Sequence, residues 1–131
     1  MQEYRDKEYF KMDKERILTR IQDCGIVAVV RAESTDKAER IVDACMEGGV
    51  AAIELTFTVP HADKVIEELA KKYDENDIIL GAGTVMDPAT ARIAMLSGAQ
   101  YIVSPFLDIE TLKMCNRYRV AMMPGIMTVR E

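Results

Sequence analysis

The feature that most constrains this chain is a regular alternation of short apolar runs with amphipathic helical patterns. The apolar runs begin near Ile26, Val50, Asp77, Gln100 and Val120, at intervals of about 20 to 27 residues. Strands that alternate with helices of this size predict right-handed βαβ units and a parallel sheet. The runs are continuously apolar, which is typical of strands that are covered on both faces.

The predicted helices have recognisable end signals. Residues 14 to 24 are predicted to form a short first helix with an apolar side, which Gly25 ends. The later helices are predicted to begin with residues that cap a helix or fit its first turn. These residues are Ser34 or Thr35, Pro60, the pair Asp87-Pro88, and Asp108.

Two architectures fit a parallel sheet of this kind: an open doubly wound sheet and a closed barrel with its helices outside. Polar residues recur where the predicted strands end, which favours a barrel whose strand ends share one mouth. The 131-residue chain contains five such strand patterns, each of the first four followed by a helical pattern. We therefore predict a polar N-terminal extension at 1–12, and at 13–131 a single barrel-like domain that begins with a short helix.

Composition argues against several classes of function. The net charge is −5, the basic residues are scattered and Trp is absent, so a nucleic-acid partner is not expected. The sequence shows no apolar run of membrane-spanning length and no signal peptide. Cys24, Cys45 and Cys115 lack the spacing of a disulfide or zinc set, which predicts buried reduced thiols, a cytoplasmic protein and no metal site.

Glu54 is the most informative single residue, because it lies at the centre of the apolar run AAIELTF (51–57). An unpaired buried charge costs several kcal/mol, so its presence needs a reason. One interpretation is a structural carboxylate that pairs with Arg31 on the neighbouring strand. The other is a general acid and base whose pKa is raised by its apolar neighbours, and its position in the strand favours this second interpretation.

The segment Gly81-Ala82-Gly83-Thr84 follows a predicted strand and precedes a predicted helix. It begins like a dinucleotide-binding fingerprint, but Met86 stands where the third glycine is required. The segment could be a tight turn that needs small residues, or a place where the backbone approaches an anionic ligand. Arg31 and Pro105 have the same two alternatives, since each could end a strand or border a ligand site.

Five segments together resemble one family, the 2-keto-3-deoxy-6-phosphogluconate (KDPG) / 4-hydroxy-2-oxoglutarate (KHG) aldolases. The resemblance runs from about Arg16 to Glu131. It implies a homotrimer of (β/α)8 TIM barrels, with residues 13–131 as the N-terminal part of one barrel and about five of its eight βα units. It also implies a class I aldolase that uses no cofactor. A lysine amine would form a Schiff base with a keto acid, which is then cleaved to pyruvate and an aldehyde. The segments are IVAVVRA (26–32), GGVAAIELTFTVPHAD (48–63), ILGAGTVMDP (79–88), GAQYIVSP (98–105) and MPGIMT (123–128).

The same resemblance implies roles for particular residues. Glu54 would shuttle protons, Thr84 would bind the pyruvyl carboxylate, and Pro105 would line the site. Arg31 would be a further anion contact. Thr58 stands where some relatives place an arginine four residues after the glutamate, which leaves the choice between KDPG and KHG open.

The family's Schiff-base lysine lies on a sixth strand, beyond Glu131. We therefore expect a truncated chain that is inactive alone and self-associates to cover its open face. Two other functions remain open. One is a phosphate-binding barrel isomerase or synthase that uses Glu54 as a base. The other is a non-catalytic half-barrel that binds a carboxylate or assembles with partners.

Overall fold

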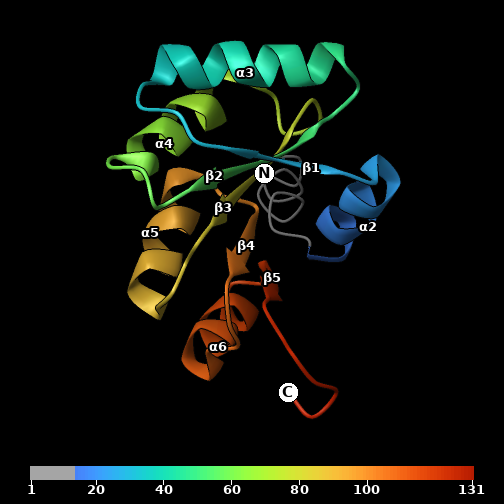
Figure 1. The fold of residues 1–131 in the computed structure, drawn as a ribbon, viewed down its shortest axis with the longest axis vertical. Helices are drawn as coiled ribbons and strands as arrows, with labels where there is room; N and C mark the ends of the chain where they lie inside the picture. Colours follow the sequence, from blue (N-terminus) through green and yellow to red (C-terminus); the bar gives the residue numbers. More distant parts are fainter. Residues whose placement is uncertain (1–13) are drawn as a thin grey trace, which may run out of the picture.

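The structure, a computed structural model, describes residues 14–131, so the extension predicted at 1–12 lies outside the described residues. Five parallel strands form one sheet in the order β1-β2-β3-β4-β5, as Figure 1 shows. Each strand begins one or two residues after its predicted start. The strands are β1 (Val27–Val30), β2 (Ala52–Thr56), β3 (Ile79–Gly83), β4 (Tyr101–Ser104) and β5 (Ala121–Pro124).

Each connection between neighbouring strands contains a helix, and one further helix precedes β1. Residues of the four connecting helices pack in one core with outward-facing strand residues, whereas the first helix packs on the opposite face. Sequential strand order with all crossovers on one face is the arrangement of a barrel wall, not of a doubly wound sheet. The fold class is thus confirmed as a partial α/β barrel. The helices are α2 (Lys14–Cys24), α3 (Thr35–Glu47), α4 (Ala62–Lys72), α5 (Pro88–Ser97) and α6 (Ile109–Arg117).

The alternation of side chains along each strand separates an outer core from an inner one. Ile53 and Leu55 of β2 point outward and pack with the outer helices. Ala52 points to the inner face, where it packs with Tyr101 and with Ile17 of helix α2. Glu54 and Thr56 follow Ala52 with the strand period of two, so polar residues of β2 also face the barrel interior.

Most of the predicted helix starts are confirmed. Ser34 accepts a hydrogen bond from the Lys37 amide, and Asp87 and Asp108 cap α5 and α6 in the same way. The prediction for Pro60 is wrong, because α4 begins at Ala62 and His61 is its N-cap. The reason is a turn at the end of β2, in which the Val59 amide donates to the Thr56 carbonyl and delays the helix.

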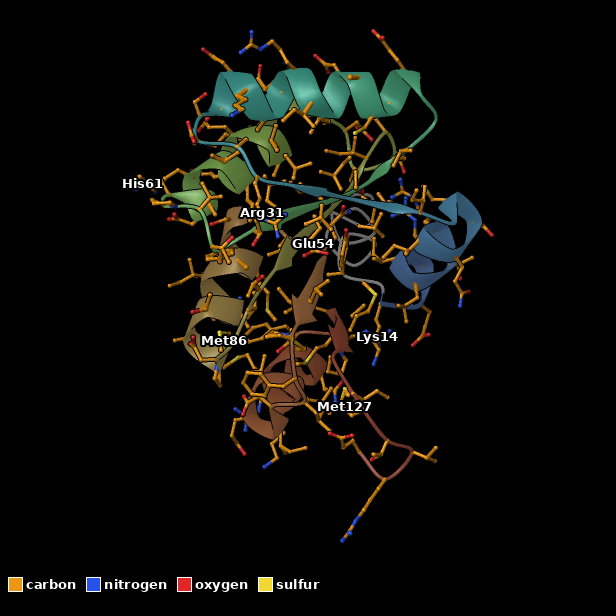
Figure 2. The ribbon with its side chains drawn as sticks, in the orientation of Figure 1. Lys14, Arg31, Glu54, His61, Met86 and Met127 are labelled. Carbon is orange, nitrogen blue, oxygen red and sulfur yellow. The ribbon has the colours of Figure 1, made fainter. Side chains whose placement is uncertain are left out.

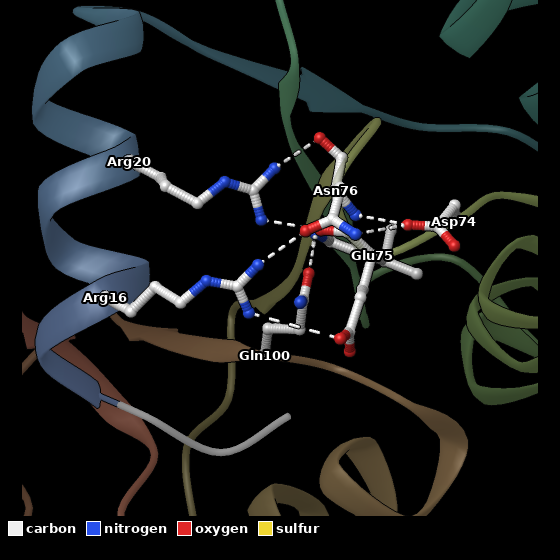
Figure 3. A network of polar contacts seen from close by, with 7 residues as sticks. Arg16, Arg20, Asp74, Glu75, Asn76 and Gln100 are labelled. Atoms are coloured by element: carbon white, nitrogen blue, oxygen red, sulfur yellow. Dashed lines mark hydrogen bonds and ion pairs between the residues drawn. The ribbon is translucent and has the colours of Figure 1, made fainter. Parts of the chain in front are cut away.

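Helix α2 is fastened to the loop that precedes β3 (Figure 3). The Arg20 guanidinium donates to the carbonyls of Glu75 and Asn76 at 2.6 and 2.9 Å. Arg16 donates to the Asn76 side chain at 2.5 Å. These bonds hold α2 against the amino ends of the strands, so the opposite edge, where the strands end, carries the candidate site.

The structure can be compared with the sequence expectations about the cysteines and about membrane-spanning segments. Cys115 is buried as predicted, but Cys24 and Cys45 are only partly buried, because Cys24 is the last residue of α2 and Cys45 lies in the last turn of α3. All three are free thiols. Among residues 14–131, no helix combines the length and the hydropathy that a membrane span requires.

Candidate active site at the carboxyl ends of the strands

Glu54 is the third residue of β2 and only 8% exposed. Its neighbours across the sheet are Val29 of β1 and Gly81 of β3. The carboxylate lies directly on Gly83, where an added Cβ would overlap Oε1. The missing side chain at residue 83 therefore creates the space that the carboxylate occupies.

The GAG segment is not the tight turn that one of its sequence interpretations predicted, whereas the approach of an anionic ligand to this edge stays a prediction. Gly81 and Gly83 lie inside β3 and not in the turn that follows it. Both are needed because other side chains fill the space above them: Tyr101 covers Gly81 and Glu54 covers Gly83. Sequence reasoning identified the glycines but assigned them to the wrong element, since a β3 that is small on its inner face cannot be told from a loop by residue type alone.

The surroundings of Glu54 favour its neutral form. Burial raises the pKa of Glu54, and the positive charge of Arg31 opposes this increase. Arg31 follows β1, is exposed, and forms no direct ion pair with Glu54 in the described part of the chain. Figure 2 shows the two side chains near one another. The interpretation of Glu54 as a structural ion-pair partner is therefore wrong, because the guanidinium acts on it only at a distance.

Three threonine hydroxyls lie together at the carboxyl end of β2, the strand that carries Glu54, and Thr56 connects them. Its Oγ1 lies 2.9 Å from Thr58 Oγ1 and 3.2 Å from Thr84 Oγ1, and it accepts a hydrogen bond from the Thr58 amide at 3.3 Å. Thr56 is 1% exposed. Sequence reasoning noted Thr56 only as a polar strand end and missed its linking role; the T-x-T spacing at the end of β2 was the available signal.

The number of protons in this cluster has a chemical consequence. Thr56 has one hydroxyl proton and already accepts from the Thr58 amide. It therefore donates to one of the other two hydroxyls and accepts from the other. One hydroxyl proton, on Thr58 or on Thr84, is left to donate to a ligand. Thr84 also has φ 44°, a conformation that is uncommon for a β-branched residue and typical of functional turns.

Pro105 lies at the same edge but contacts a different partner. It follows β4, is exposed, and its carbonyl packs against the α-carbon of Gly125, where an added Cβ would overlap it. The Gly125 amide donates to the Ser104 carbonyl at 2.7 Å, which ties the ends of β4 and β5 together. The structure thus brings Glu54, Thr58, Thr84 and Arg31 together around β2, and places Pro105 two strands away.

Known proteins similar to this chain are aldolases. The KHG/KDPG aldolase of Escherichia coli strain K12 is 33% identical over 122 residues, which are 93% of this chain and 55% of that protein. A solved 4-hydroxy-2-oxoglutarate / KDPG aldolase from TTHB1 has a TM-score of 0.76 at 26% identity, covering 92% of this chain and 56% of that one.

A second solved structure is KDPG aldolase from Legionella pneumophila with pyruvate captured as a covalent carbinolamine. It has a TM-score of 0.73 at 27% identity and covers 79% of this chain and 50% of that one. The chain thus spans about half the length of the relatives it matches. Residues 17–131 match the model of the family described as KDPG and KHG aldolase. The chain therefore belongs to the KDPG and KHG aldolase family.

Proposed function

We propose that this chain supplies the proton-transfer and carboxylate-binding part of a class I aldolase that cleaves KDPG or KHG to pyruvate and an aldehyde. One observation carries the proposal: a buried carboxylate with a raised pKa, Glu54, lies beside threonine hydroxyls and an exposed arginine. A carboxyl group whose pKa is raised toward neutrality can both take up and release a proton. The pyruvate bound by the Legionella relative supports a 2-oxo acid as the ligand.

The charged and the neutral residues of the site have different proposed roles. Glu54 would carry a proton to and from the carbon that becomes the methyl group of pyruvate. The hydroxyl of Thr84 or Thr58 would donate to the substrate carboxylate, and Arg31 would offset its negative charge. Pro105 would line the site from β4. Since Thr58 is neutral, the exposed Arg31 supplies the positive charge near Glu54.

The Schiff-base amine, in this proposal, comes from outside the described residues. Within residues 14–131, every lysine lies on a helix, and none lies at the strand ends where Glu54 and Thr84 meet. We propose a cytoplasmic protein, which the three free thiols support. We also propose self-association, because among the described residues β1 and β5 each pair with a strand on one side only. The family resemblance implies that the assembly is a homotrimer.

Pyruvate titration of the isotopically labelled chain, followed by nuclear magnetic resonance, tests the carboxylate site. We expect amide shifts at Gly83 and Thr84, and binding weakened about tenfold by Thr56→Val, which removes the linking hydroxyl, with Thr56→Ser as the rescuing control. If saturating pyruvate shifts no amide near β2 and β3, the carboxylate site is wrong.

Reduction with borohydride in the presence of pyruvate tests the origin of the amine. We expect no covalent mass adduct on this chain. An adduct would show that one of its own lysines forms the Schiff base and would refute that part of the proposal.

A second candidate is an isomerase or synthase in which Glu54 acts as a base without any Schiff base. The helical position of every described lysine favours it. Solvent deuterium incorporated into the methyl group of pyruvate, with no borohydride adduct, would support it over the aldolase. Pyruvate binding without exchange or adduct would support a carboxylate-binding module without catalysis.

A further inference from the structure

Tyr101 lies on the inner face of the sheet, in the layer beneath Glu54, and is fully buried. Its ring occupies the space that a side chain on Gly81 would need, since an added Cβ there would overlap three ring atoms. Gly81 is also the residue that pairs with Glu54 across β2 and β3. The ring therefore fills the position next to the carboxylate on the side facing the barrel interior.

The hydroxyl group of Tyr101 has a separate function. It donates to the carbonyl of Ile53, the residue before Glu54, at 2.9 Å. This buried bond reaches from β4 across β3 to β2, so it fixes the backbone of β2 at the residue that precedes the carboxylate. The pKa of Tyr101 is raised by burial and, to a smaller extent, by the negative charge of Glu54.

We propose that Tyr101 is a positioning residue for Glu54. Its ring excludes water from the space beneath the carboxylate, and its hydroxyl holds strand β2 in place through the hydrogen bond to Ile53. This inference rests on the proposed role of Glu54 as proton carrier, and it adds the residue that fixes the position and surroundings of the Glu54 carboxyl group. Without the ring, the space above Gly81 would admit water beneath the carboxylate. Without the hydroxyl, β2 would lose a bond that no other described side chain makes to Ile53.

The other groups that affect Glu54 come from neighbouring elements. Arg31, after β1, stabilises the ionised form. From the opposite side, Cys24 of α2 acts on Tyr101 and not on Glu54. The threonine cluster at the end of β2 and the start of the β3–α5 loop is neutral. Burial is therefore the cause that raises the pKa of Glu54. The Tyr101 ring lies over Gly81, the cross-strand neighbour of Glu54, and so forms part of the inner surface at this position.

The test is a pH titration of the Glu54 carboxyl carbon in the full chain labelled with ¹³C-glutamate, with the resonance assigned by Glu54→Gln. In Tyr101→Ala we expect the Glu54 midpoint to move down toward the ordinary value for glutamate, because water reaches the carboxylate. In Tyr101→Phe we expect the midpoint to stay, because the ring remains. Amide hydrogen exchange in β2 should become about fivefold faster in Tyr101→Phe, because this variant loses the hydrogen bond to Ile53.

Tyr73 provides the matched controls, because its hydroxyl also donates a hydrogen bond, to Asp43 at 2.6 Å, but on the outer side of the fold. Tyr73→Ala and Tyr73→Phe should leave both the Glu54 midpoint and β2 exchange unchanged. If Tyr101→Ala does not fold, Tyr101→Leu replaces it and should lower the midpoint by a smaller amount. A folded Tyr101→Ala or Tyr101→Leu with the wild-type midpoint overturns the role of the ring, as does an equal change in Tyr73→Ala.

Unchanged β2 exchange in Tyr101→Phe overturns the role of the hydroxyl. The titration uses no substrate, so it separates this inference from the proposed function. Failure of pyruvate to bind would leave the Glu54 midpoints interpretable, and unchanged midpoints would leave the pyruvate result standing.

Discussion

Gly83 determines where the charge of Glu54 can lie, because the carboxylate occupies the space that any larger residue at this position would fill. Gly83→Ala should therefore displace the carboxylate or the strand, and destabilise the fold by about 1–3 kcal/mol. Denaturant unfolding measures the change. Gly48→Ala is the control, since an added Cβ there meets ordinary contacts at 3.4 and 3.5 Å and should cost well under about 1 kcal/mol. If Gly83→Ala and Gly48→Ala lower the free energy of unfolding equally, the close packing of Glu54 against Gly83 is contradicted.

Glu54 itself should make stability depend on pH in a direction that its burial fixes. Since burial raises the folded-state pKa of Glu54, the native state holds this proton more tightly than the unfolded chain does. The stabilising contribution is fully present below the unfolded pKa and is lost as pH rises through the folded pKa. Glu54→Gln removes this loss, so we expect its melting temperature to exceed that of the wild type near pH 7, with a difference that shrinks toward pH 4.

Calorimetry at matched pH values measures that difference, and the remaining titrating groups are common to both proteins. A constant difference across the range would show that Glu54 does not titrate differently in the folded and unfolded states. A difference of the opposite sign would show that Arg31 outweighs burial.

At this scale the sequence predicted charge and hydroxyl positions better than the contacts between them. Glu54 was identifiable because a carboxylate inside an apolar strand is unusual, and Thr84 because it follows a glycine-rich strand end. The packing of Glu54 over Gly83 and of Tyr101 over Gly81 could not be predicted, because each contact depends on the register between two strands. Tyr101 looks like any core aromatic residue until its hydroxyl is placed on Ile53.

Among the elements, helix α2 depends on polar contacts as well as on its apolar side. Arg20 makes two hydrogen bonds to backbone carbonyls of the loop before β3, and burial lowers the pKa of its guanidinium. Arg20→Met keeps much of the aliphatic stem and removes both bonds, so it should destabilise the protein by roughly 1–3 kcal/mol. Hydrogen exchange should show the loss first in α2, if the helix opens separately from the sheet.

Lys71→Met is the matched control for Arg20→Met. Lys71 pairs with Glu67 and Glu68 on the exposed side of α4, and such surface pairs contribute at most about 1 kcal/mol. If Lys71→Met costs as much as Arg20→Met, the effect comes from lost charge and not from the attachment of α2.

Element boundaries show which local signals were sufficient. The α5 start was predictable because Asp87 accepts from Thr90 within one turn and Pro88 has no amide to satisfy. Pro60 misled because the same residue type also fits a turn, and the turn after β2 is set by bonds to Thr56. A helix cap can be predicted from a few neighbouring residues, whereas the length of the connection before a helix depends on where the preceding strand ends.

At the scale of the whole molecule, the alternation of apolar runs and helices was enough to predict parallel strands in chain order. It was also enough to place the polar strand ends at one edge, since all strands run the same way. Which surface remains open required the structure. Alternation assigns a side chain to a face but not its exposure: Val29, on the inner face, is 50% exposed beside the buried Glu54.

Among residues 14–131, no strand pairs with the outer edge of β1, and the inner face beside this edge is open. Both should drive association between copies of the chain, since an exposed strand edge with apolar side chains is a template for pairing. Val29→Lys places a charge on that face and should weaken association at least about tenfold, measured by sedimentation over a concentration series. Ile93→Lys adds the same charge on helix α5 at nearly the same exposure, 47% against 50%, and should change association little. Weakening by Ile93→Lys alone would move the contact to the outer helices, and a wild-type monomer at every concentration would exclude self-association altogether.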